Sequence, residues 1–195
     1  MTDRTPRIRA GLVQAVLSAA RSQACGPAAL ARLDPSTLTQ VESSGSREWL
    51  PASVYADAVE AIYVAGGHEA LDACIREASA GIHAGPVGRA IWRGFTALFT
   101  IKPETMLAAF PRALRRLMRG VGRLRVDIED DEPRATTRWS GVPTVLQRES
   151  VALAHRSGYT YALGFAGVHE VELTHDLSRA HEGVFTFEIR WRPRS

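Results

Sequence analysis

Apolar residues recur with a helical period over roughly the first 120 residues of the chain. In the segment 49–67, Tyr55, Val59, Ile62 and Tyr63 fall at positions i, i+4, i+7 and i+8, which places them on one helix face. Further stripes of this kind predict helices over about 6–20, 69–81, 85–100 and 104–120. The N-terminal part of the chain is therefore expected to form a helical layer.

The hydrophobic period changes after Gly122. The segment "RLRVDIE" alternates apolar and polar residues, which predicts a half-buried strand that pairs with "RATTRWSG" in a hairpin. One helix over about 142–167, or two joined near Gly158, follows, and then two more alternating segments, "HEVELTH" and "VFTFEIRW". We therefore expect one α+β domain over residues 1–195, with the helical layer packed on a C-terminal antiparallel sheet of about four strands. Residues 1–45 are expected to be a helical extension of a core over residues 46–195.

Three histidines, His169, His175 and His181, are spaced six residues apart around the first strand of the closing hairpin. On a strand, His169 and His175 point to the same face but lie about 20 Å apart at ~3.3 Å per residue, too far apart to bind one ion. His181 falls in the connecting loop without an identifiable third ligand, so no metal site is predicted. The buried face of this hairpin is expected to carry Val171, Leu173, Phe185, Phe187, Ile189 and Trp191.

The composition is that of an ordinary globular protein, with 45% hydrophobic and 23% charged residues. A net charge of +3 is too small to predict nucleic-acid binding. No apolar run reaches the roughly 18 residues that a membrane span needs. Cys25 and Cys74 are isolated in the sequence, which fits a reducing compartment and suggests neither a zinc site nor a redox pair. We expect a cytoplasmic, soluble protein without specific nucleic-acid binding.

Positive charge is concentrated in an arginine-rich stretch over residues 112–125. Arg112, Arg115, Arg116 and Arg119 follow i, i+3, i+4 and i+7 spacing, which predicts a shared helix face. The first interpretation is a solvated helix face, and the alternatives are docking to an acidic partner, an anionic surface or phosphate. DNA recognition is the weakest alternative, because no helix-turn-helix or aromatic platform accompanies the arginines.

Common catalytic motifs are missing from the sequence. There is no GxSxG elbow, no GxxxxGK[ST] loop and no GxGxxG after a strand. His155, on the last long helix, could perform acid–base chemistry with Glu149 or Tyr159, although a lone histidine is usually structural. No catalytic residue is assigned, and an enzyme remains the third hypothesis for this chain.

The order of these signals resembles an uncharacterised bacterial family that is prominent in myxobacteria. The resemblance rests on "WLPASVY", "GRAIWRGF", "KPETMLAAFPRALRRLMRGVGRLRV", a helix ending in "YALGFAG" and the closing hairpin. It covers roughly residues 45 to 191 and rests on patterning and a few Pro, Trp and Gly positions. More distantly, the chain is similar to the superfamily of haem-nitric-oxide-binding domains, vinyl-reductase-like sensor domains and TRAPP transport-complex subunits.

The resemblance implies a helical layer on a small antiparallel sheet, with an apolar pocket that binds a small hydrophobic ligand or a protein. The haem-binding branch uses a proximal histidine on a helix and a Tyr-x-Ser-x-Arg motif. The local letters here are "YTYAL", so the propionate-binding motif is absent and we expect no haem and no other cofactor. The cysteine cluster of some vinyl-reductase-like domains is absent too.

The leading hypothesis is a non-enzymatic sensory or regulatory module that binds a small apolar ligand or a protein partner. The residues expected to line its pocket are Trp92, Phe95, Phe99, His155, Phe185, Phe187 and Trp191. A plain hydrophobic core has the same pattern and is the commoner case. The second hypothesis is an interaction or assembly subunit that has no ligand and docks an acidic partner through Arg112, Arg115, Arg116 and Arg119. The sequence leaves homodimer formation open.

Overall fold

The computed structural model describes residues 5–84, 102–129, 131–168 and 170–192. Its N-terminal part is helical, as the apolar periodicity predicts. The helices of this part are α1 (Ala10–Ser22), α2 (Gly26–Leu30), α3 (Pro35–Ser43) and α4 (Ala52–Ala84). The predicted helix over 85–100 lies outside the described residues.

Helix α4 contains the two helices that the sequence predicts on either side of Gly66 and Gly67. Gly67 has φ 73° and ψ −170°, which interrupts the helical backbone at that point. Because L side chains rarely adopt this φ, glycine is the residue that suits the junction. The predicted helix end at Gly67 is therefore present as a kink, and the chain resumes its helix without a loop.

The C-terminal part contains a four-stranded antiparallel sheet in the order β4-β5-β7-β6. Its strands are β4 (Arg123–Ile128), β5 (Arg134–Ser140), β6 (Val171–Asp176) and β7 (Val184–Trp191). A 3₁₀ turn over Thr144–Leu146 follows β5, and another over Ala180–Glu182 joins β6 to β7. The predicted α+β class, with its C-terminal sheet of four strands, is confirmed.

The register of β6 and β7 confirms which side chains face the core. Leu173 pairs with Ile189 and His175 pairs with Phe187, so these residues share one face of the sheet. Phe185, Phe187, Ile189 and Trp191 on β7 are all buried. His169 lies outside the described residues.

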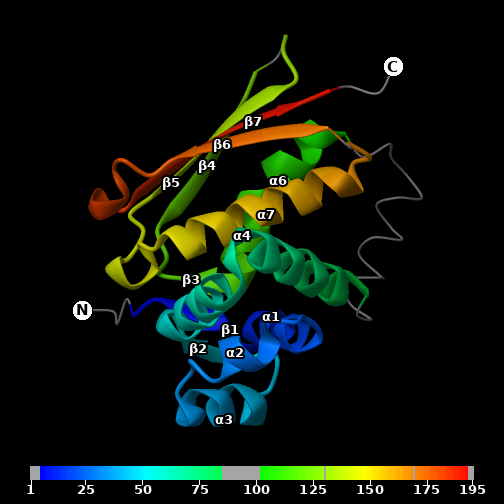
Figure 1. Ribbon diagram of the computed structural model, residues 1–195. Coiled ribbons are helices and arrows are strands. Elements are labelled where there is room, and N and C mark those ends of the chain that lie inside the picture. The colour runs from blue at the N-terminus through cyan, green and yellow to red at the C-terminus, as the bar shows by residue number, and fades with distance from the viewer. Residues whose placement is uncertain (1–4, 85–101, 130, 169, 193–195) are drawn as a thin grey trace.

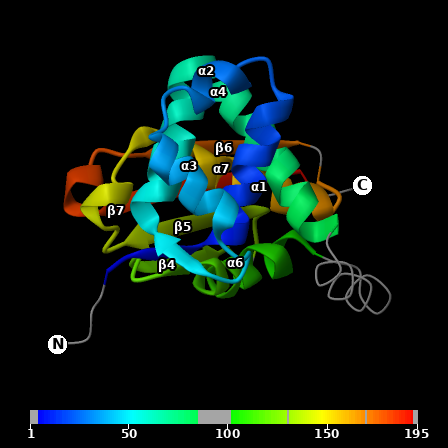
Figure 2. The same cartoon turned by 90° about the horizontal axis from the view of Figure 1, so that it is seen from below.

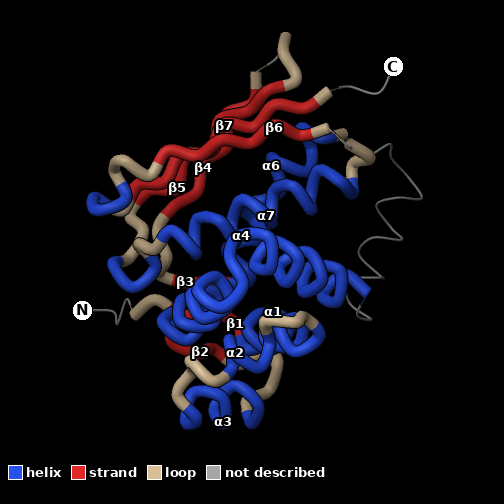
Figure 3. Tube along the Cα trace, in the orientation of Figure 1, coloured by secondary structure: helices blue, strands red, loops and turns tan. Residues whose placement is uncertain are grey.

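Two helices cover this face of the sheet, α6 (Pro103–Leu117) and α7 (Glu149–Phe165). The sheet forms an upper layer in Figures 1 and 3, α7 lies beneath it, and α4 and α1 follow. Polar contacts attach α7 to α4: Ser150 Oγ donates to Glu60 Oε2 at 2.6 Å, and Arg148 pairs with Asp57 at 2.9 Å. None of the described helices is long and apolar enough to cross a lipid bilayer.

A second, small sheet was not predicted from the sequence. Strands β1 (Arg7–Arg9), β2 (Trp49–Pro51) and β3 (Met118–Arg119) form it in the order β2-β1-β3. The predicted first helix therefore begins at Ala10, and the predicted helix from Trp49 begins at Ala52. Figure 2 views the molecule from below, from the side on which α1, α2 and α3 lie.

Strand β3 also corrects the prediction that Arg119 shares a helix face with the preceding arginines. Helix α6 ends at Leu117, and Met118 is extended with φ −136° and ψ 145°. Met118 pairs with Ile8 and Arg119 pairs with Arg7. Long-range strand pairing therefore overrides the local helical periodicity at this point, because it satisfies backbone groups that would otherwise be left open at the helix end.

Candidate functional site

A cluster of aromatic rings surrounds His155 where α7 meets the sheet. The imidazole stacks on the Trp139 ring from β5, with centroids 4.7 Å apart and planes 28° apart. Phe110 from α6 meets it edge-on at 5.3 Å, and Phe187 from β7 lies at 5.6 Å. One turn along α7, the Tyr159 hydroxyl lies 3.1 Å from His155 Nε2. Helices α6 and α7 and the four-stranded sheet thus all contribute side chains to one enclosed aromatic cluster.

Burial determines the ionisation of this cluster. His155 is 7% exposed, and burial lowers its pKa to about 3. Burial also raises the pKa of Tyr159 above its ordinary range. Both groups are therefore neutral at physiological pH. A neutral, enclosed imidazole already hydrogen-bonded to a tyrosine is not placed to exchange protons with a substrate from solution.

The predicted pocket residues of the described chain lie on the inner face of the sheet or on α7. His155 and Phe187 are in contact, and Phe185 meets Trp139 edge-on with centroids 5.8 Å apart. Trp191 lies at the other end of β7, paired with Val171. Trp92, Phe95 and Phe99 lie outside the described residues. That these seven residues line a ligand pocket stays a prediction.

Sequence reasoning placed Tyr159 beside His155 but missed two other aromatic members of the cluster, Trp139 and Phe110. Trp139 has the same strand parity as Ala135 and Thr137, which are buried, so alternation along "RATTRWS" could have found it. Tyr159 stands four residues after His155 on the same helix, a spacing that places both on one face. Phe110 had only its place in the apolar stripe of α6 as a signal.

The described residues do not fit a haem bound through His155. A haem iron held by a protein histidine needs a ring nitrogen that faces the open space occupied by the porphyrin. His155 Nε2 instead meets the Tyr159 hydroxyl, and Phe110, Trp139 and Phe187 pack around the ring. His68 and His181 are exposed on the surface, and His175 is half-buried on β6; the side chains of His83 and His169 are not among those the structure describes.

The histidines and acids of the closing hairpin do not converge. His181 is exposed on the turn before β7, where its Nε2 lies 3.7 Å from a Glu182 oxygen. His175 faces inward beside Phe187, with ring centroids 6.5 Å apart. In the described segments, no group of three His, Cys, Asp or Glu side chains is placed to hold a metal ion.

A cavity of about 310 Å³ lies where the end of α6 meets the beginning of β4. Ten residues line it: Pro111, Leu114, Arg115, Met118, Arg119, Gly120, Val121, Gly122, Arg123 and Leu124. The apolar members Leu114, Met118, Val121 and Leu124 are buried, whereas the three arginines are exposed. The cavity therefore combines an apolar floor with a cationic rim.

The predicted partner-binding arginines flank this cavity or line it. Arg112, Arg115 and Arg116 are exposed on α6. Arg119, on β3, places its guanidinium carbon 4.1 Å from the centroid of the Trp49 ring, and Arg9 lies over the same ring at 3.9 Å. Arg119 is thus held in place by the small sheet.

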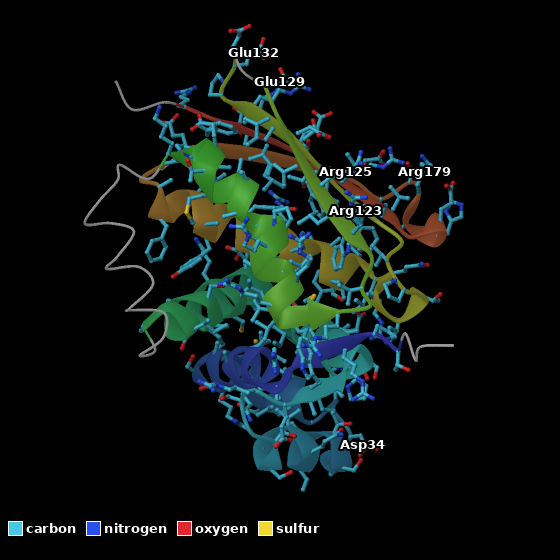
Figure 4. All side chains as sticks on the ribbon, turned by 180° about the vertical axis from the view of Figure 1, so that it is seen from behind. Asp34, Arg123, Arg125, Glu129, Glu132 and Arg179 are labelled. Carbon is cyan, nitrogen blue, oxygen red and sulfur yellow. The ribbon has the colours of Figure 1, made fainter. Side chains whose placement is uncertain are left out.

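Two of the acidic residues that follow this stretch in sequence, Glu129 and Glu132, lie away from the arginines in space. Figure 4 shows Arg123 and Arg125 on β4, with Glu129 and Glu132 at the far tip of the β4–β5 hairpin. Glu129 is 3.5 Å from Arg134. Within the described residues, none of the arginines at 112, 115, 116, 119, 123 and 125 forms an ion pair.

Comparison with solved structures identifies the fold. An H-NOX protein from K. algicida, solved as the unliganded Fe(II) form, superposes with a TM-score of 0.67 and 9% identity, covering 96% of this chain and 98% of its own. An H-NOX protein from S. oneidensis in the Fe(II)NO ligation state gives a TM-score of 0.56 and 11% identity, covering 94% and 99% of the two chains. No family model and no curated protein matches the sequence. This chain therefore has the fold of H-NOX proteins.

Proposed function

We propose that this chain is a non-enzymatic sensory or regulatory module that binds a small, largely apolar ligand without haem. The observation that carries the proposal is the H-NOX-like fold, which extends over 96% of the chain. The similar structures hold Fe(II), and one of them binds NO. Binding of a small molecule by proteins of this fold is what a sensor requires. We place this protein in the bacterial cytoplasm.

The absence of haem is part of the proposal and rests on the surroundings of His155. Its ring nitrogen bonds to Tyr159, and three further aromatic rings pack around it. A haem ligated there would have to displace the rings that join α6, α7 and the sheet. The "YTYAL" segment also lacks the arginine and serine of the propionate-binding motif.

The non-enzymatic part of the proposal rests on the same residue. His155 is the candidate acid–base group, but it is buried and its pKa is lowered to about 3. A general base works best when its pKa lies near the working pH. Glu149, the other suggested partner, is exposed at the start of α7 and outside the aromatic cluster.

Native mass spectrometry of freshly purified protein tests the ligand. We expect a mass above that of the polypeptide, and the excess should disappear under denaturing conditions and correspond to an organic molecule lacking iron. Extraction and re-addition of that molecule should restore the excess mass. A clean polypeptide mass from several expression hosts, unchanged by added apolar compounds, would contradict ligand binding.

Docking of an acidic protein partner through the exposed face of α6 is a second candidate function. The observation that favours it is the absence of ion pairs at Arg112, Arg115 and Arg116 within the described residues. The double variant Arg115→Glu/Arg116→Glu should abolish capture of the partner at unchanged stability. Arg138→Glu, on the exposed face of β5, is the matched control. Retained capture by the double variant would remove this candidate.

A further inference from the structure

The cavity between α6 and β4 has the dimensions of a small binding site. Its volume of about 310 Å³ is at the lower end of the ~300–1,000 Å³ typical of small-molecule sites. Leu114, Met118, Val121 and Leu124 are between 4% and 9% exposed, so its floor is continuous with the hydrophobic core. A ligand seated there would bury an apolar body against these side chains.

The rim of this cavity is cationic and uncompensated. Arg115 from α6, Arg119 from β3 and Arg123 from β4 approach it from three different elements. The described chain supplies no carboxylate that pairs with any of them. Guanidinium groups bind carboxylates and phosphates through paired, charge-assisted hydrogen bonds. An anionic group would therefore find partners at the rim that the protein itself leaves open.

Two contacts fix the geometry of the rim before any ligand binds. The Trp139 Nε1 donates to the Val121 carbonyl at 2.7 Å, which attaches the Gly120–Gly122 turn to the aromatic cluster around His155. Arg119 lies over Trp49, which attaches the other side of the rim to the small sheet. Preorganised groups lose less conformational freedom on binding. The rim also connects directly to both the four-stranded sheet and the N-terminal strands.

We propose that the α6–β4 cavity binds a small amphipathic anion, which has an apolar body and one carboxylate or phosphate monoester group. The apolar body lies on Leu114, Met118, Val121 and Leu124, and the anionic group is held by Arg115, Arg119 and Arg123. This site deepens the proposed function, on which it rests, by naming the class of ligand and its place. It differs from the predicted pocket around Phe185 and Phe187.

Titration with four related probes tests the site on the intact chain. Decanoate should bind, acetate should not because it lacks the apolar body, and decanol should bind much more weakly because it lacks the charge. Decyl phosphate compared with decanoate separates the two kinds of head group. Binding is followed by calorimetry and by the fluorescence of Trp49, with Trp49→Phe identifying its share of the signal.

Variants then locate the binding. Arg115→Ala/Arg123→Ala should raise the Kd for decanoate at least about tenfold, the effect of losing one charge-assisted hydrogen bond. Arg125→Ala/Arg138→Ala removes two exposed charges outside the cavity and should leave the Kd unchanged. If both variants weakened decanoate binding equally, the arginines would act only by general electrostatic attraction of the anion, and the proposal would be overturned. Circular dichroism and thermal unfolding establish that both variants fold.

The failure of this site and the failure of the proposed function give different results. If the natural ligand is present by native mass spectrometry but neither anionic probe binds at the cavity, the anion site is wrong and the sensor function remains. If no small molecule of any kind binds, both are wrong. If an acidic peptide binds through Arg115 and Arg123 while decanoate does not, the cavity is part of a protein-docking surface and the small-molecule site is overturned.

Discussion

His155 couples the stability of the protein to pH. Its folded pKa of about 3 lies below the ordinary value of 6.5, so the unfolded chain binds a proton that the folded chain excludes. The contribution of His155 to the unfolding free energy is fully present above about pH 6.5 and is lost progressively as the pH falls toward 3. At pH 5 the unfolding free energy should be about 2 kcal/mol lower than at pH 7.5 from this residue alone.

Urea unfolding of the wild type and of His155→Gln at both pH values measures this contribution. The variant should show a pH-dependent loss smaller by about 2 kcal/mol, because glutamine does not titrate. Burial also lowers the pKa of His175, but that residue remains in both proteins and cancels in the comparison. An imidazole NMR signal of His155 that titrates between pH 5 and 8 would contradict the buried, neutral assignment.

Trp49 stabilises the small sheet through two arginines. The guanidinium carbons of Arg9 and Arg119 lie 3.9 and 4.1 Å from its ring centroid. Trp49→Leu removes both cation–π contacts and should lower the unfolding free energy by about 1–2 kcal/mol. Trp49→Phe keeps an aromatic face and should lose less than half as much. Equal losses in the two variants, measured by chemical unfolding, would show that the ring contributes only apolar packing.

The turn between β3 and β4 depends on glycine at position 122. Gly122 has φ 91°, and a Cβ there would lie 2.3 Å from the Ser140 carbonyl oxygen and 2.6 Å from that of Gly141. Gly122→Ala should therefore lower the unfolding free energy by at least about 2 kcal/mol. It should also weaken anion binding, because the turn forms part of the cavity wall.

Gly164 in α7 provides the control for this substitution. A Cβ at that position meets nothing within 4 Å, and its φ is not positive. Gly164→Ala should raise the unfolding free energy by about 0.5–1 kcal/mol, because alanine favours the helix. Thermal unfolding of both variants would contradict the account if Gly122→Ala were as stable as the wild type.

The elements of the main sheet could be predicted from the sequence, but the small sheet could not. Alternation along "VFTFEIRW" specifies both the strand and its buried face, because the side-chain period on a strand is two. Strands β1, β2 and β3 are two or three residues long, which is too short for a periodic signal. Their pairing joins Arg7–Arg9 to Met118–Arg119, a contact that only the folded chain creates. The sequence therefore predicts Arg119 on a helix, because the arginine spacing is helical and the strand pairing leaves no local signal.

For the protein as a whole, the sequence predicts the class of the fold and some of the cavity arginines, but not the cavity itself. Most of the described helices precede the four strands of the main sheet, and α7 lies between β5 and β6, so the chain forms a helical layer on a four-stranded sheet. The apolar aromatic residues could not be divided between core and pocket, because both need the same side chains. The cavity at α6 and β4 depends on three arginines from separate elements, which only tertiary packing brings together.

The layers also connect the candidate site to the rest of the protein. The cavity residue Val121 accepts a hydrogen bond from Trp139, which stacks on His155 of α7, and α7 is attached to α4 through Ser150 and Glu60. Packed elements of this kind transmit a change at one site only when they have two stable arrangements. A continuous set of contacts therefore runs from the cavity through α7 to α4.

The central claim is that this chain keeps the H-NOX fold but functions without haem. The most direct test is the absorbance spectrum of the purified protein titrated with haemin, reduced, and exposed to NO, alongside an H-NOX protein of known haem content. The account predicts that at each stage the spectrum matches that of haemin treated in the same way without the protein, and that no Soret band co-elutes with the protein. A stoichiometric, protein-bound Soret band that shifts with NO, and is lost in a histidine variant, would contradict it.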